Sequence, residues 1–535
     1  MTGQGGSARP ARPARGLARR AGAIAILALA AASAGGAGAG EVPPAGAYII
    51  DNPTPSQGFG PAFFRKVKPT EAFPGPPTGL LAPEAWLQRE LAKPEPVSRL
   101  ARTLLFGRDG AADAAGFFAW LGLTQMRSAA GGEAQPIGAY PVDTELGAGY
   151  TFGCAACHSQ NFFGVFVFGM ANKTPRANRL FTLAKAFAQN APMAFFAPED
   201  AAEAALIRRA QWHLQFVGAR EPQALGLDTS LAQVSLSLAR RDTDAAASLT
   251  EALAVNPRPD PFDTAIADSK PMDWWPVKYK DRWLADGALV KGSFVLTNFL
   301  WNEIGRGTDL AELSAWLDAN PAVIDDITRF VMTAEPPRID DFVDDAVDTA
   351  AARRGEAHFL DNCSRCHGVY RKNWSSGYRT VSVDYPKPTK VRNVGTDPNR
   401  AAGTAYLASR LNRLALSRRY GMVLEPTGGY VPPPLVGIWS RYPYLHNRSV
   451  PNLCELLKPE AERVRRYFVG TTVTVATDFD RACVGYPLAD IPQAWRTRER
   501  LFNTARTGLS NSGHNMFVDA ADGDKRDLIE FLKTL

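Results

Sequence analysis

Two short strings decide the fold of this chain: CAACH at residues 154–158 and CSRCH at residues 363–367. Both follow the pattern C-x-x-C-H, and together they use four of the six cysteines in the 535-residue chain. In this pattern two thiols bond to the two vinyl groups of one haem, and the adjacent histidine ligates the iron. The sequence therefore predicts two covalently bound haems c, held by Cys154, Cys157, His158, Cys363, Cys366 and His367.

Two other interpretations of these strings fit less well. A zinc site needs a second pair of ligands nearby, and neither motif has one. A thioredoxin-like redox pair does not need a trailing histidine, least of all twice. The two remaining cysteines, Cys454 and Cys483, form either a disulfide in an oxidising compartment or two buried thiols.

The N-terminal residues 1–39 predict a secretory signal peptide. Five arginines without an acidic residue precede an apolar run at 21–32, and small residues follow. A disordered basic tail and an uncleaved anchor are the alternatives. We expect a periplasmic or secreted protein without a stable membrane span, because no other long apolar run exists. These arginines supply five of the six net positive charges, so the charge gives no reason to expect a nucleic-acid partner.

The length of the chain predicts two or three domains, and the motifs begin 209 residues apart, so each haem has its own domain. The boundary is expected at Pro336-Pro337. Residues 40–336 would form an N-terminal haem c domain with an extended arm at 41–80 and a helical insertion at 201–254. Residues 337–535 would form a C-terminal cytochrome c domain.

The expected fold is mainly α, with two cytochrome c-type haem domains, long loops and no strand-rich segment. In the C-terminal half, a helix at 350–360 leads into the second motif, and residues 368–445 should be mostly loop. A closing helix capped by Asp524 places Leu528, Phe531, Leu532 and Leu535 on one face. In the N-terminal half, helices are expected at 85–128, at 310–317 and from Pro321 to the boundary.

Several strings resemble a known superfamily. The run RYPYLHNRSVPNL at 441–453 resembles the PYxHNGS-type signature of the dihaem cytochrome c peroxidase superfamily, and RNVGTD at 392–397 is similar as well. The ending at 512–535 looks closest to the dihaem rubber-oxygenase branch. The resemblance covers the C-terminal half, whereas in the N-terminal half it is firm only at CAACH. Arg448 departs from the signature, which has glycine there.

The resemblance implies an exported dihaem oxidoreductase with divided roles. In the rubber-oxygenase branch the N-terminal haem reacts with peroxide or dioxygen, and the C-terminal haem has two histidine ligands and passes electrons; ordinary bacterial peroxidases reverse these roles. The partners would be a redox protein or small electron donor and an unknown co-substrate. The superfamily also implies calcium between the domains, although no carboxylate cluster here demands it. The alternative is a non-catalytic dihaem electron carrier, which would need less chain.

The resemblance places the sixth ligand of the C-terminal haem at His514. The alternatives are a surface-loop histidine at that position and Met516 as the ligand. His446 lies in the aromatic signature and is a candidate for catalysis: it would contact a haem edge or hydrogen-bond a propionate, and the alternatives are direct ligation and packing in the core. His358 is expected to be structural, and His213 is expected to be a surface histidine of the helical insertion.

Two further residues are candidates for catalysis. Trp275, in the string DWWPVKYK at 273–280, would relay electrons or wall an apolar pocket, unless the tryptophans only pack the core. Glu303 would be an acid–base group near the reactive haem, unless it is a cap or a salt-bridge partner.

Overall fold

The computed structural model describes residues 82–86, 89, 114–126, 135–229, 231–242 and 245–535. The predicted signal peptide at 1–39, the predicted arm at 41–80 and most of the helical prediction at 85–128 lie outside these residues. Within the last of these ranges, α5 (Ala114–Trp120) is helical. None of the helices in the described ranges combines the length and the apolar character needed to cross a membrane.

The first haem motif lies on a 3-10 helix, η3 (Cys154–Ala156), between two antiparallel hairpins, β4 (Ala139–Thr144) with β5 (Gly147–Phe152) and β6 (Ser159–Phe162) with β7 (Val165–Phe168). The β6–β7 turn consists of Phe163 and Gly164, whose φ angles are 53° and 85°. Two successive positive φ angles are the conformation of a type I′ turn, which suits the twist of a hairpin. The motif is therefore held between two paired-strand units.

This strand-rich segment contradicts the prediction that none exists. In β7 the three residues Phe166, Val167 and Phe168 are all buried. Because both faces of the strand are covered, apolar and polar residues do not alternate, and the sequence signal for a strand is absent. The mainly α class with two cytochrome c domains stays a prediction. The remaining short strands are β1 (Ala82–Pro83), β2 (Gln125–Met126), β3 (Gln135–Pro136), β8 (Leu289–Lys291), β11 (Val423–Leu424), β12 (Arg466–Phe468) and β13 (Leu501–Asn503).

Helices occupy much of residues 177–333. Asp200 begins α8 by accepting a hydrogen bond from the backbone N–H of Glu203 at 2.8 Å. The predicted helical insertion holds α8 (Ala201–Phe216), α9 (Leu231–Leu238) and α10 (Glu251–Val255). The helices predicted from 310 and 321 are confirmed as α12 (Leu310–Ala319) and α13 (Pro321–Thr333). The others in this part are α6 (Ala177–Phe187), α7 (Met193–Phe196) and α11 (Phe294–Gly305).

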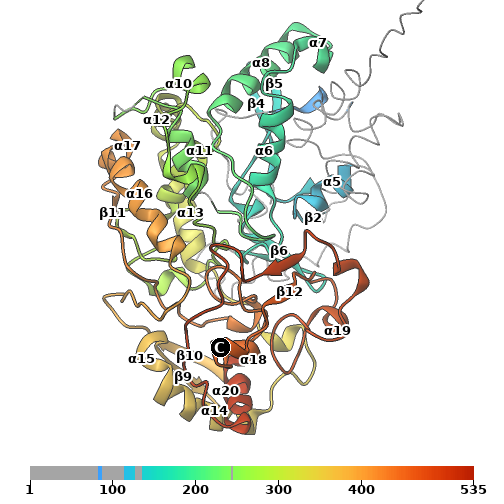
Figure 1. The fold of residues 1–535 in the computed structure, drawn as a ribbon, viewed down its shortest axis with the longest axis vertical. Helices are drawn as coiled ribbons and strands as arrows, with labels where there is room; N and C mark the ends of the chain where they lie inside the picture. The colour runs from blue at the N-terminus through green and yellow to red at the C-terminus, as the bar shows by residue number, and fades with distance from the viewer. Residues whose placement is uncertain (1–81, 87–88, 90–113, 127–134, 230, 243–244) are drawn as a thin grey trace, which may run out of the picture.

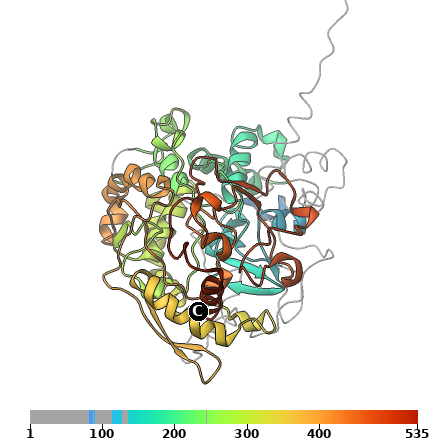
Figure 2. The same cartoon turned by 60° about the horizontal axis from the view of Figure 1, so that its bottom comes forward.

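The second motif lies at one end of the molecule (Figures 1 and 2), on α15 (Ser364–His367), directly after α14 (Thr349–Asn362). The closing helix, α20 (Asp522–Lys533), packs on α14, and it begins at Asp522 rather than being capped by Asp524. The two helices are close because Gly355 has no side chain: a Cβ there would lie 1.9 Å from the carbonyl oxygen of Asp527. The predicted order of opening helix, motif and closing helix is present.

Residues 368–445 are less loop-rich than predicted. They contain β9 (Val369–Asn373), β10 (Arg379–Asp384), α16 (Asn399–Arg413) and α17 (Ala415–Arg419). Helix α16 lies beside the N-terminal half (Figure 1), where its Leu407 and Leu411 share a buried core with Leu231 and Leu300. A second buried core joins Phe162 and Trp275 to Trp439. The boundary at 336 stays a prediction, since residues from both sides of it pack together.

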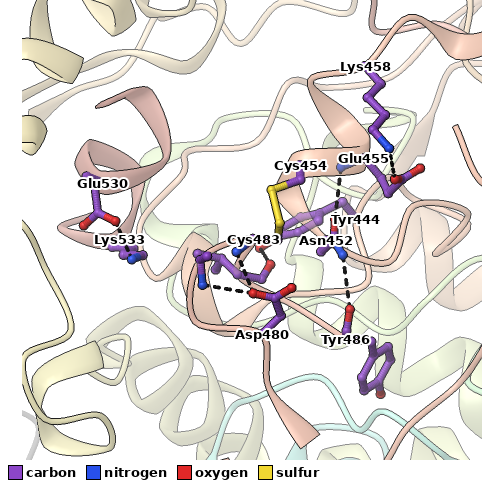
Figure 3. Close-up of a disulfide and its surroundings, with 12 residues drawn as sticks. Tyr444, Asn452, Cys454, Glu455, Lys458, Asp480, Cys483, Tyr486, Glu530 and Lys533 are labelled. Carbon is purple, nitrogen blue, oxygen red and sulfur yellow. Dashed lines mark hydrogen bonds and ion pairs between the residues drawn. A yellow bond between two sulfur atoms is a disulfide. The ribbon is translucent and has the colours of Figure 1, made fainter. Parts of the chain in front are cut away.

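Of the two alternatives for Cys454 and Cys483, the disulfide is the one found (Figure 3). Cys454 lies in α18 (Leu453–Leu456), which Asn452 caps by accepting a hydrogen bond from Glu455 N–H at 3.0 Å. Asp480 accepts a hydrogen bond from the backbone N–H of Cys483 at 2.9 Å, which orders the other end. The bond closes a chain segment with a sequence separation of 29 residues. The remaining short helix of this half is α19 (Val475–Asp478).

Candidate functional site

Both haem motifs line one cavity of about 500 Å³. All six predicted cofactor residues of the two motifs contribute to its wall, and their four cysteines are not paired in disulfides. Burial raises the pKa of Cys154 and of Cys363 to about 11, so both stay thiols at neutral pH. Free thiols next to a cavity-facing histidine fit thioether attachment of a haem better than a thiolate–metal site.

At the first motif, the backbone orients the imidazole of His158. Its Nδ1 lies 2.8 Å from the carbonyl oxygen of Met272, which can only accept, so Nδ1 carries the proton. Burial lowers the pKa of His158 to about 4, and the ring is therefore neutral. Its Nε2 is left with the lone pair that an iron requires. Trp274 lies beside this ring, at 5.4 Å between ring centres.

The second motif repeats this arrangement and adds a second imidazole. The Nδ1 of His367 lies 2.8 Å from the carbonyl oxygen of Pro433, and burial lowers the pKa of His367 to about 4. His514 also lines the cavity, and its ring centre is 6.2 Å from that of His367. Two metal–nitrogen bonds of about 2 Å each, together with the distance from each ring centre to its ligating nitrogen, account for such a separation. The side chains present thus fit a haem with two axial histidines.

The other histidines lie elsewhere. His213 is buried rather than exposed as predicted, and its Nδ1 lies 2.9 Å from Gly307 O. His358 is 3.5 Å from Asp524, which links α14 to α20. His446 lines the cavity and stacks on Tyr430 at 4.0 Å, and its buried Nε2 has no hydrogen-bond partner. All six histidines of the chain lie in described ranges, and none of the other five makes a ring contact with His158.

The three predicted catalytic residues have different positions, and His446, described above, lines the cavity. Trp275 is fully buried and does not line the cavity; its Nε1 donates to the carbonyl oxygen of Val436 at 3.1 Å. Glu303 lines the cavity, but it pairs with Arg306 and accepts from the hydroxyl of Thr308 at 2.7 Å. Burial raises the pKa of Glu303. The salt-bridge alternative for Glu303 is thus the arrangement found.

Aromatic side chains wall part of the cavity, and two of them, Trp283 and Phe294, belong to the same apolar cluster as Cys154. The residues concerned come from the loop before β8 and from α11, and they are Trp283, Phe294, Phe299 and Trp301. Trp283 and Phe294 contact each other at 5.5 Å between ring centres. The pocket interpretation of the tryptophan-rich region therefore applies to Trp283 and Trp301, and to Trp274 beside His158.

Several buried charges around the cavity were missed from the sequence. Asp273 and Arg441 form an ion pair, and Lys280 Nζ donates to the sulfur of Met272 at 3.4 Å. Burial lowers the pKa of Lys280 to about 7. No sequence signal marks these residues, because isolated lysines and arginines are usually solvated. Among the described residues no cluster of three or more His, Cys, Asp or Glu side chains could hold a further metal ion, so the calcium prediction gains no support.

Comparison with known proteins adds one family match and two relatives. Residues 429–468 match a family model described as RoxA-like, cytochrome c-like. This segment contains the whole string at 441–453 that resembles the dihaem signature, and the match supports the resemblance to the rubber-oxygenase branch. It also supports a haem c protein with oxidoreductase chemistry.

The two relatives come from Sinorhizobium fredii. The uncharacterized protein y4iJ is 28% identical over 258 residues, covering 37% of this chain and 41% of the relative. The uncharacterized protein y4iM is 30% identical over 233 residues, covering 35% of this chain and 49% of the relative. The matched part thus spans about half the length of these relatives or less. The chain is similar to a RoxA-like cytochrome c over residues 429–468.

Proposed function

We propose that this protein is a dihaem c-type oxidoreductase with one reactive centre, at His158, and one electron-transfer centre, at His367. The asymmetry between the two histidines carries the proposal. His367 has a second imidazole, His514, at a distance that suits a shared metal. His158 has an aromatic neighbour, Trp274, and no histidine ring contact. An open iron position at the first motif would supply redox chemistry with peroxide or dioxygen.

The residues around the first centre would prepare it for this chemistry. The carbonyl oxygen of Met272 holds His158 in the tautomer that leaves Nε2 available. The aromatic wall formed by Trp283, Phe294, Phe299 and Trp301 excludes water and offers an apolar surface to a co-substrate. Glu303 is held by Arg306 and Thr308, so it would orient Arg306 at the cavity rather than transfer protons freely.

Two roles remain proposals for residues further from His158. Trp275 would relay electrons, since it lies one residue from Trp274 and donates to the segment that orients His367. His446 would contact a haem edge, because its unpartnered Nε2 lies in the cavity wall. The electron donor would be a redox protein or a small molecule.

The disulfide supports export. Disulfides persist in oxidising compartments and are rare in the cytosol. Together with the haem motifs, the Cys454–Cys483 bond favours the proposed periplasmic or secreted location.

Haem content and spin state test the proposal. We expect two haems per chain in the purified protein, one giving a low-spin and one a high-spin ferric signal in electron paramagnetic resonance. Peroxide, or dioxygen after reduction, should change only the high-spin component. Two low-spin haems that ignore both oxidants would instead identify an electron carrier.

A further inference from the structure

Two short segments hold the proximal histidines and are joined to each other. The segment 272–275 supplies the carbonyl oxygen of Met272 to His158, and the segment 433–436 supplies that of Pro433 to His367. The residues that follow these two carbonyls in sequence, Asp273 and Pro434, both interact with Arg441. A single side chain thus connects the supports of the two centres.

The connection is a buried ion pair. Arg441 Nε lies 3.3 Å from Asp273 Oδ2, and both side chains are less than one-tenth exposed. Asp273 Oδ1 accepts the backbone N–H of Ala171 at 2.9 Å, and the guanidinium of Arg441 donates to Pro434 O at 2.7 Å. These bonds hold the negative charge of Asp273 on the His158 side and the positive charge of Arg441 on the His367 side.

We infer that this ion pair sets the difference in reduction potential between the two centres. The inference rests on the proposed dihaem function. A nearby negative charge stabilises the oxidised, more positive iron, and a nearby positive charge destabilises it. Asp273 therefore lowers the potential at His158, and Arg441 raises the potential at His367. The pair biases electrons towards the second centre. That centre holds them until an oxidant binds at the first centre.

The surroundings make each charge effective. Both residues line the cavity but are withdrawn from bulk water, so solvent screens them weakly. Lys270 lies close by, with its Nζ 2.9 Å from Arg441 O, and Lys280 also lines the cavity. Lys270 and Lys280 donate to other groups, and within the described ranges Arg441 is the side chain that forms an ion pair with the Asp273 carboxylate.

Spectroelectrochemical titration of single variants tests the inference. Asp273→Asn should shift the reduction equilibrium of the first haem towards the reduced form by tenfold or more, which raises its reduction potential by 59 mV or more for one electron. The reduction potential of the second haem should rise by less. Arg441→Gln should lower the second potential by a similar factor and the first by less. Arg441→Lys keeps the charge and should preserve both. The matched control is Asp260→Asn, since Asp260 forms a buried ion pair with Arg410 away from the cavity wall.

Potential shifts of opposite sign in Asp273→Asn and Arg441→Gln distinguish this role from a structural one. A loosened fold would shift the reduction potentials of both variants in the same direction. Shifts of equal sign in Asp273→Asn and Arg441→Gln, or a larger shift at the wrong haem, would overturn the inference. If Arg441→Gln fails to fold, Asp273→Asn and Arg441→Lys decide the question. Haem content and oxidant reactivity of the unmodified protein test the proposed function separately. The variant His514→Ala assigns each redox transition of the titration to one of the two motifs.

Discussion

Replacing His514 with alanine is the sharpest test of the asymmetric site. The two imidazoles of the second centre are 6.2 Å apart between ring centres, and His514 Nδ1 is buried without a hydrogen-bond partner. The separation of the two rings, and not a hydrogen bond at Nδ1, is what suits His514 as a ligand of the same metal as His367. In the proposed dihaem protein, removing the His514 ring would open the sixth position of one of the two haems. The low-spin ferric signal should disappear and the high-spin signal should about double.

The assay is quantitative electron paramagnetic resonance of the ferric protein at constant haem content. Added imidazole should enter the space left by the ring and restore the low-spin signal of the variant. His213→Ala is the matched control, because His213 is also a buried histidine but contacts Gly307 away from the cavity. A low-spin signal that survives in His514→Ala would refute the assignment and point to Met516, which lines the same cavity.

Three further predictions concern stability. Replacing Cys454 and Cys483 with serine should cost roughly 3–4 kcal/mol of unfolding free energy from loop entropy over their separation of 29 residues; chemical denaturation with and without reductant measures it, and reductant should not affect the variant. Gly355→Ala should lower the melting temperature and loosen the second motif, because its Cβ would lie 1.9 Å from Asp527 O; an unchanged melting temperature would show that the helices adjust freely. Burial lowers the pKa of His213 from 6.5 to about 4, so its contribution to stability is complete above about pH 6.5 and is lost as pH falls towards 4. His213→Gln should flatten the dependence of melting temperature on pH in that window, and an unaltered slope would contradict this origin.

Much of the second half could be predicted from local sequence. Helix α14, the motif and α20 follow from an amphipathic pattern and from cysteine spacing, both of which depend on neighbours along the chain. The number of cysteines and the compartment allowed a disulfide without excluding two buried thiols, and the structure has the disulfide. The hairpins around the first motif were missed, and in β7 the reason is that a strand covered on both faces loses its alternation.

The candidate site was predictable only in part, because only some of its residues belong to a local sequence pattern. His158 and His367 are recognisable because each directly follows the two cysteines that would anchor its haem. The tryptophan chosen as catalytic, Trp275, points into the core, while its neighbour Trp274 lies beside His158. Which of two adjacent side chains faces a cavity depends on the path of the loop, and no periodic pattern records that path.

The sequence by itself determined the chemistry of attachment: two C-x-x-C-H strings, each complete within five residues, predict haem c without reference to the fold. The tertiary structure alone decided what surrounds them. It placed His514 near His367, Trp274 beside His158, and the Asp273–Arg441 pair between their supports. These contacts join residues more than 100 positions apart, so they depend on the packing of the whole chain and not on any local pattern.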